Sequence, residues 1–351
     1  MTAAWTLALA LAGAALLVLL HHAFWTRRLA APVGDDARLA ARTRDGWRLE
    51  LGRRLPRGAA RRPPVLLCHG LSANRWMLDP GVEGRSLSAF LAGAGFDCFA
   101  LDLRGHGGSR RGPPGASRWD FDTYLAEDVP AALQAVREAA GEDRVLWVGH
   151  SLGALLGMAA CQAHPARMAG LVAIAGPVHM PAFSGAVHLL LPARGRRNRF
   201  LAAMAAPLAG MVRLPLAEGI IARENLEAPV YRRLLANAIE DVPPGVFAQI
   251  RGWVRDDAFR SAGGDVDYRE GLSGCRQPAL FVSAPLDRLA PPRVVRASFE
   301  RWGGEKAYWC ASREAGLSAD YSHTDLLVGR RAPEDVFPRV RDWLSAHSET
   351  A

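Results

Sequence analysis

The residues Val145–Gly153, VLWVGHSLG, decide the fold. They begin with four apolar residues, Val145–Val148, which fit a short strand, and they lead into a run of small residues, Leu152–Ala163, which fits a helix. A G-x-S-x-G motif between a strand and a helix predicts a sharp turn that lifts the serine hydroxyl above the edge of a sheet. We therefore interpret Ser151 as a nucleophile. The alternative, a glycine turn with a bystander serine, is disfavoured by this strand-to-helix context.

Three further residues, Gly149, His150 and Gly153, complete the predicted nucleophile elbow. Glycine is expected at the two outer positions because side chains there would collide with the neighbouring strand and helix. His150 belongs to the turn and is interpreted as structural. The helix that begins after Ser151 brings positive partial charge to the hydroxyl, and the backbone N–H of Leu152 is expected to be one of two donors to an oxyanion.

Outward from this motif, short apolar runs alternate with helical patterns. Bare apolar runs of this length are typical of strands buried on both faces of a parallel sheet. The expected strands are Trp47–Leu51, Val65–Cys68, Cys98–Leu101, Leu171–Ala175, Ala279–Ser283 and Ala307–Cys310, and the expected helices are Ser86–Ala94, Phe121–Ala139 and Val336–Leu344. This alternation predicts a doubly wound, mostly parallel α/β sheet.

The stretch from Gly176 to about Tyr268 breaks the alternation. It carries helical apolar patterns without a convincing strand, and proline, glycine and arginine interrupt it repeatedly. We interpret it as a mostly helical insertion over the carboxyl edge of the sheet. Its large apolar side chains would suit an acyl chain, although they could equally form the insertion's own core; they are Phe183, Leu189–Leu191, Phe200, Met204, Met211 and Trp253.

The base and the acid that a serine nucleophile needs are predicted after the last two strands. His323, in the sequence YSHTD, lies between the last strand and the last helix, where it can reach a serine at the sheet edge. His179 and His188, in the insertion, are the alternatives. Asp287 follows the strand Ala279–Ser283 in a proline-containing turn and is the expected partner of the histidine.

Two other acidic residues compete with Asp287 for this role. Asp325 is close to the histidine in sequence, but it is interpreted as a residue that braces the entry to the following helix. Asp102 ends a strand and is interpreted as bracing its own loop. The order Ser151, Asp287, His323 is the order expected for a nucleophile on this kind of strand-to-helix turn.

The second oxyanion donor is expected from the loop after Val65–Cys68, in the sequence His69-Gly70-Leu71. Gly70 allows the backbone to turn so that the N–H of Leu71 points at the site. An ordinary turn at the end of a strand is the alternative interpretation.

Together these motifs resemble the α/β-hydrolase fold superfamily, and the resemblance covers residues 47–345. The residues that carry it are CHGL at Cys68–Leu71, DLRGHGGS at Asp102–Ser109, the GHSLG elbow, Asp287 and His323. Within the superfamily, HGLSANRW and the sequence around His323 are similar to the acid-lipase and polyhydroxyalkanoate-synthase branch. Those synthases carry cysteine at the elbow, so Ser151 favours a lipase or esterase. In both families an inserted segment caps the site.

The resemblance implies a serine hydrolase that cleaves carboxylic esters through an acyl-enzyme on Ser151. Two alternatives stay open: acyl transfer to another acceptor, as in a polyester synthase or depolymerase, and a non-catalytic module with the same fold. We find no metal cluster, phosphate loop or dinucleotide glycine motif in the sequence and expect no cofactor. The expected substrate is a small-molecule or lipid ester.

The N-terminal stretch predicts a membrane anchor. The residues Ala3–Leu20 carry no charge, and the stretch stays uncharged through Trp25. At about 1.5 Å per residue this length covers a bilayer core. A cleaved signal peptide, with a cleavage context near Leu29–Ala31, is the alternative, but no positive charge precedes the apolar run. The arginines that follow predict a cytoplasmic catalytic domain.

Composition excludes several other classes. The 351 residues carry a net charge of +8, and only one of the 43 basic residues, Lys306, is a lysine. The arginines are spread along the chain, so we expect no nucleic-acid partner. Five widely spaced cysteines without a CxxC disfavour a zinc site or a disulfide framework.

The predicted organisation has six segments. They are a transmembrane anchor (1–26), a linker (27–46), the first part of the α/β core (47–175), the helical cap insertion (176–268), the second part of the core (269–345) and a tail (346–351).

Overall fold

The computed structural model describes residues 2–59, 61–113, 118–180, 198–211 and 219–348. Its centre is an eight-stranded sheet with the order β1-β2-β4-β3-β5-β6-β7-β8. The first two strands are antiparallel to their neighbours, and the other six are mutually parallel. The strands are β1 (Ala37–Arg42), β2 (Arg48–Arg54), β3 (Arg61–Cys68), β4 (Phe96–Asp102), β5 (Val145–His150), β6 (Met168–Ile174), β7 (Ala279–Ser283) and β8 (Lys306–Cys310).

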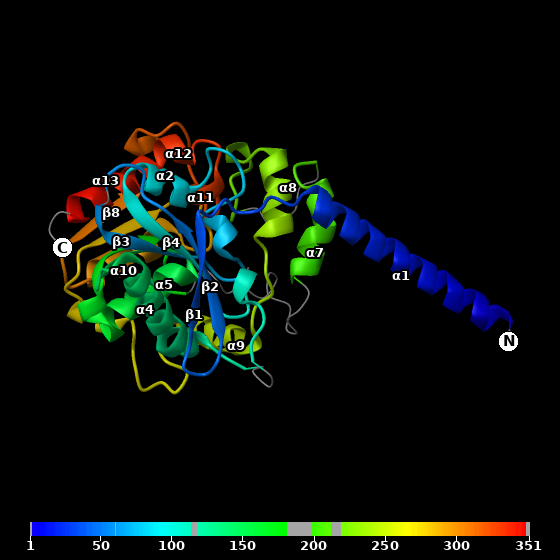
Figure 1. The fold of residues 1–351 in the computed structure, drawn as a ribbon, viewed down its shortest axis with the longest axis horizontal. Helices are drawn as coiled ribbons and strands as arrows, with labels where there is room; N and C mark the ends of the chain where they lie inside the picture. Colours follow the sequence, from blue (N-terminus) through cyan, green and yellow to red (C-terminus); the bar gives the residue numbers. More distant parts are fainter. Residues whose placement is uncertain (1, 60, 114–117, 181–197, 212–218, 349–351) are drawn as a thin grey trace.

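Helices cover both faces of this sheet (Figure 1). On one face lie α2 (Leu87–Gly93) and α13 (Phe337–Ser348), and on the other lie α4 (Val129–Ala140), α5 (Leu152–Ala163) and α10 (Pro292–Arg301). The short helices α3 (Phe121–Thr123), α11 (Asp325–Val328) and α12 (Ala332–Asp335) connect the larger elements. This arrangement confirms the predicted doubly wound α/β fold.

The predicted strands and helices correspond to observed ones, with ends that differ by a few residues. Every residue of β4, β5, β6 and β7 is buried, as expected for strands covered on both faces. The predicted helix Phe121–Ala139 is continuous but irregular, since a five-residue π-helical stretch, Tyr124–Asp128, joins α3 to α4. It ends at Gly141, whose φ of 71° lets the backbone turn in the left-handed region.

The predicted linker, residues 27–46, is in part wrong because it contains the edge strand β1. This strand pairs antiparallel with β2 over Ala37–Arg42. One face of the strand carries Ala37, Leu39 and Ala41, and the other carries Arg38, Ala40 and Arg42, so its apolar pattern is weak. An antiparallel edge strand needs only one buried face, and here Ala41 is buried and Leu39 is half-buried against the core.

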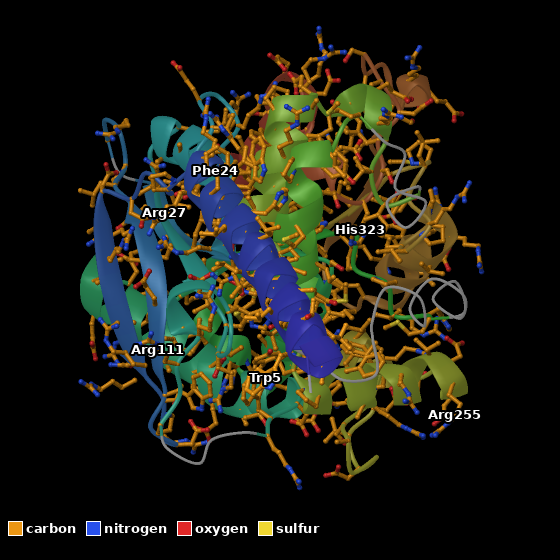
Figure 2. The ribbon with its side chains drawn as sticks, turned by 90° about the vertical axis from the view of Figure 1, so that its right-hand side faces the viewer. Trp5, Phe24, Arg27, Arg111, Arg255 and His323 are labelled. Carbon is orange, nitrogen blue, oxygen red and sulfur yellow. The ribbon has the colours of Figure 1, made fainter. Side chains whose placement is uncertain are left out.

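The chain begins with a single long helix, α1 (Thr2–Arg28), that extends away from the domain (Figure 1). Its residues Ala4–Arg28 are long and apolar enough to cross a membrane, and none of the apolar window is buried in the protein. Figure 2 shows Trp5 near its outer end and Phe24 and Arg27 near the domain. A signal sequence would pass the same test of length and composition.

The insertion contains three α-helices among its described residues: α7 (Asn198–Ala205), α8 (Ala228–Asn237) and α9 (Pro244–Asp256). No strand of the sheet lies in the part of 176–268 that the structure describes, in agreement with the predicted helical character. Helices α7 and α8 pack against each other and against the domain end of α1 (Figure 1). The insertion therefore lies between the α/β core and the apolar helix.

Candidate active site

Ser151 occupies a strained turn between β5 and α5. Its φ and ψ are 54° and −116°, a conformation that costs a non-glycine residue free energy and is common at functional sites. A Cβ on Gly149 would lie 2.2 Å from the carbonyl oxygen of Gly153, and a Cβ on Gly153 would lie 2.3 Å from the carbonyl oxygen of Cys68. Glycine is thus required at both positions by close backbone contacts, as the sequence predicts.

The elbow is held by the neighbouring strand and by the helix that follows. The N–H of Ser151 donates to the carbonyl of Ile174 at 2.8 Å, which ties the turn to the end of β6. The Ser151 carbonyl accepts from Ala154 and Leu155, so α5 starts directly after the serine. Leu152 is the first residue of α5, and an N–H in the first helical turn has no acceptor within its own helix.

His323 and Asp287 form a buried pair beyond the ends of β8 and β7. The Nδ1 of His323 lies 2.7 Å from Oδ2 of Asp287, and the two residues are 5% and 2% exposed. The other carboxylate oxygen accepts from the N–H groups of Leu289 and Ala290, both at 2.8 Å. Because both of its oxygens are bound, the Asp287 carboxylate is fixed in place. Since Nδ1 of His323 faces this carboxylate, the other ring nitrogen, Nε2, points away from it.

The His323 loop is attached directly to the nucleophile elbow through His150. The Nε2 of His150 donates to the carbonyl oxygen of His323 at 3.0 Å, and the two rings are 4.7 Å apart. Burial, together with the neighbouring His323, lowers the pKa of His150 to about 3, so its imidazole is neutral near pH 7. The sequence identified His150 as a structural residue, and the structure assigns it this bond between the two loops.

The loop after β3 lies against the same elbow. A Cβ on Gly70 would lie 3.0 Å from the Cβ of Ser151, so this loop passes directly beside the serine. His69 fixes the start of the loop, since its Nδ1 donates to the Gly70 carbonyl and its Nε2 accepts from the N–H of Leu103. Burial lowers the pKa of His69 to about 4, which keeps the ring neutral. Leu71 therefore follows a rigid turn beside Ser151.

Asp325 and Asp102, the two competing acids, both brace loops. Asp325 accepts from the N–H of Ser322 at 3.1 Å. It also accepts from two groups of the cap insertion, the side chain of Asn225 at 2.8 Å and the N–H of Ala222 at 3.0 Å. Asp102 accepts from the N–H of Arg75 at 2.9 Å and from that of Gly108 at 2.8 Å. Burial raises the pKa of each of these two carboxyl groups.

The alternative histidines are not brought to Ser151 by any described contact. His179 pairs with Asp257 at 2.9 Å, near the end of α9. His188 lies outside the described residues, as do Phe183 and Leu189–Leu191 of the predicted apolar set.

The cap residues Phe200 and Trp253 have different environments. Trp253 is 2% exposed, packs on Phe121 and Phe259 with ring centroids 5.0 and 5.1 Å away, and donates to the Arg260 carbonyl. It therefore holds α9 on the core, which favours the structural interpretation of this residue. Phe200 is 37% exposed and stacks on His22 of α1 at 4.9 Å.

Two residues that the sequence analysis did not single out, Asn74 and Glu240, connect the cap to the loop after β3. The Nδ2 of Asn74 donates to Oε1 of Glu240 at 2.9 Å and to the carbonyl of Asn237 at 2.8 Å. Glu240 is one of several acidic residues in the insertion, and nothing in the sequence distinguishes it from the others.

Comparison with protein families gives a match to the alpha/beta hydrolase fold over residues 63–324. Gastric triacylglycerol lipase of Mus musculus is 31% identical over 137 residues, which is 35% of this chain and 34% of that lipase. Triacylglycerol lipase 2 of Arabidopsis thaliana is 25% identical over 349 residues, 85% of this chain and 82% of the relative. The match to the gastric lipase thus spans about a third of that protein's length.

Solved structures share the fold. A thermophilic esterase from Thermogutta terrifontis superposes with a TM-score of 0.58 at 19% identity, over 89% of this chain and 99% of the esterase. At this identity the likeness concerns the fold alone.

Proposed function

The chain belongs to the alpha/beta hydrolase fold family, and we propose that it is a serine hydrolase of the lipase and esterase type. One observation carries the proposal: Ser151 occupies a strained elbow, and the buried pair of His323 and Asp287 is bonded to that elbow through His150. We assign Ser151 as nucleophile, His323 as general base and Asp287 as the carboxylate that orients the imidazole.

In the proposed reaction, Oγ of Ser151 attacks the ester carbonyl carbon while its proton passes to Nε2 of His323. The tetrahedral intermediate collapses, the bond to the alcohol oxygen breaks, and the leaving alcohol takes the proton from His323. Water then attacks the acyl-enzyme and gives one proton to His323. Collapse of the second intermediate releases the carboxylic acid and returns the proton to Ser151.

We assign the backbone N–H groups of Leu71 and Leu152 as donors to the oxyanion. Leu152 begins α5, so its N–H is available and the partial positive charge of the helix adds to it. Leu71 follows Gly70, where an added Cβ would lie 3.0 Å from the Cβ of Ser151. One such donor accounts for a factor of about 10² to 10³ in turnover.

The substrate that we propose is a lipid ester with an apolar acyl chain. Support comes from exposed apolar side chains of the cap: Phe200 and Leu201 on α7, which packs against α1, and Leu208 and Met211 shortly after α7. If α1 crosses a bilayer, these side chains lie close to its surface, because Phe200 stacks on His22 of that helix. We further propose that α1 is an uncleaved anchor with the catalytic domain on the cytoplasmic side, since Arg27 and Arg28 follow the apolar stretch.

A fluorophosphonate probe tests the nucleophile, and a panel of p-nitrophenyl esters of increasing chain length, together with lipid esters, tests the substrate class. We expect labelling of Ser151 and hydrolysis of esters. Analysis of the products with and without an added alcohol distinguishes water from another acyl acceptor. A folded protein that neither reacts with the probe nor cleaves any ester would refute the proposal.

A further inference from the structure

The loop that carries Leu71 is held from two different sides. At its start, His69 bonds the Gly70 carbonyl and the N–H of Leu103, both within the α/β core. At its end, Ser72 is bonded to Glu240, which lies between the cap helices α8 and α9. The N–H of Leu71 thus lies between one residue fixed by the core and one residue fixed by the cap.

Ser72 has an unfavourable backbone conformation that requires such support. Its φ of 54° lies in the left-handed region, which is unfavourable for a non-glycine residue because of its Cβ. Two backbone groups of Glu240 hold it there: the N–H of Glu240 donates to the Ser72 carbonyl at 2.9 Å, and the Glu240 carbonyl accepts from the Ser72 hydroxyl.

The side chain of Glu240 fixes that backbone contact in place. It is 2% exposed, and its Oε1 accepts from Asn74 at 2.9 Å, from the N–H of Gly107 at 3.1 Å and from Arg110 at 2.6 Å. Burial alone would raise the pKa of this carboxyl, but the bonds from Arg110 and Asn74 outweigh it and lower the pKa. The Glu240 side chain is therefore a carboxylate anion. It binds three groups of the core: the side chain of Asn74, which follows the Leu71 loop, and the N–H of Gly107 and the side chain of Arg110, which follow β4.

We propose that Glu240 is a positioning residue that holds the N–H of Leu71 in line with the oxyanion, so that the placement of the cap controls the oxyanion hole. This inference rests on the proposed function. This role differs from a merely structural one, because the N–H of Leu71 stabilises the transition state more than it stabilises the bound ester. A displacement of about 1 Å at such a group can cost about 10²-fold in rate.

The test is Glu240→Ala, with Glu227→Ala as the matched control. Glu227 is a second cap carboxylate, and it pairs with a core arginine, Arg85, also at 2.6 Å. Its described contacts do not involve the loop that carries Leu71 (residues 69–72, the oxyanion loop). With a soluble short-chain ester we expect kcat of Glu240→Ala to fall about 10- to 100-fold, while KM changes less than about threefold. The control is expected to keep kcat within about twofold.

Two further measurements keep the outcome decisive. Glu240→Gln preserves the shape of the side chain and should retain more kcat than alanine, and it replaces alanine if that variant does not fold. Hydrogen exchange of the peptide covering residues 69–76 should become faster in Glu240→Ala and stay unchanged in Glu227→Ala. This readout needs no catalysis, so it separates failure of this inference from failure of the proposed function.

Equal losses of kcat in the two alanine variants would overturn the inference. So would a change confined to KM, or unchanged exchange at residues 69–76 in the Glu240 variant.

Discussion

The α/β core and the cap hold the candidate site in different ways. In the core, Ser151 and Asp287 follow the buried strands β5 and β7, His323 follows the half-buried strand β8, and hydrogen bonds to backbone groups fix their loops. The cap reaches the same loops through side chains and through its backbone. Glu240 bonds the loop that carries Leu71, and Asn225 bonds Asp325. The carbonyl groups of Gly219 and Ile220 accept from the N–H groups of Arg288 and Thr324, next to Asp287 and His323. A change in the core should therefore abolish the chemistry, whereas a change in the cap should alter its rate or its selectivity.

The largest effect is expected at the centre of the core. Ser151→Ala should reduce ester hydrolysis by more than about 10⁴-fold and by as much as about 10⁶-fold, because the remaining groups can stabilise a transition state but cannot form an acyl-enzyme. The thermal midpoint should stay near that of the unmodified protein, or rise, because the hydroxyl of Ser151 makes no hydrogen bond to a described residue and alanine removes this half-buried polar group from the turn. Turnover and circular dichroism melting of the purified variant check both points, and unchanged turnover would remove Ser151 from the mechanism.

The next largest effect is expected at Asp287, one of two buried acids near His323; the other is Asp325. Asp287→Asn should reduce turnover by up to about 10⁴-fold, because an amide cannot stabilise the imidazolium and favours the wrong tautomer. Asp325→Asn should reduce it far less, since Asp325 accepts backbone and amide donors from the cap and from Ser322 and does not bond the imidazole. Turnover of both variants at one pH provides the comparison. A greater loss in Asp325→Asn would reverse the assignment of the acid.

The core could be predicted from the sequence because its function requires local patterns. The elbow needs glycine at residues 149 and 153, where the backbone distances leave no room for a side chain. Buried parallel strands need continuous apolar runs; Asp287 lies in the turn after such a run, β7, and His323 lies in the longer loop between β8 and α11. These requirements depend on neighbours along the chain and are therefore visible in it.

The cap contacts could not be predicted in the same way. Glu240 binds Asn74, 166 residues away in sequence, and nothing beside it along the chain marks that contact. Trp253 illustrates the same limit, because an apolar residue on a helix fits a substrate wall and a packing contact equally well. Only the folded structure shows that it packs on Phe121 of the core. The edge strand β1 was not predicted for a related reason, since its inward face carries only one large apolar residue, Leu39, between two alanines.

Alanine variants of Trp253 and Phe200 test whether different cap residues determine the stability of the fold and the preference for ester chain length. Trp253→Ala should lower the free energy of unfolding by about 3–5 kcal/mol, since it removes a fully packed indole from the contact between α9 and the core. Phe200→Ala should cost little stability, because that ring is partly exposed. Urea denaturation measures both. Phe200→Ala should instead change the ratio of long-chain to acetate ester hydrolysis, and equal scaling of all esters would assign this residue to stability as well.

The smallest effect on chemistry is expected from removal of the helix. A chain that lacks residues 1–26 should be soluble and should hydrolyse short soluble esters about as fast as the full-length protein, because no assigned catalytic residue lies there. This cut keeps Leu29 and Ala31, whose backbone groups bond Asn237 of the cap, and keeps the bond from Trp76 to the Ala31 carbonyl. A cut after Ala31 removes these bonds and should lower the thermal midpoint relative to the shorter deletion.

The same helix should determine access to membrane substrates and the side on which the reaction occurs. Activity of the shorter deletion on lipid esters in vesicles should fall relative to the full-length protein, because the surface concentration is lost. In spheroplasts, external protease should leave the catalytic domain intact, since moving Arg27 and Arg28 across the bilayer costs several kcal/mol (about 2.5–3.5 kcal/mol for one arginine at the bilayer centre). N-terminal sequencing should find the chain starting before Thr6. A mature terminus near Ala31, or digestion from outside, would make this an exported hydrolase and would mean that the anchoring contacts of Leu29 and Ala31 serve only the fold.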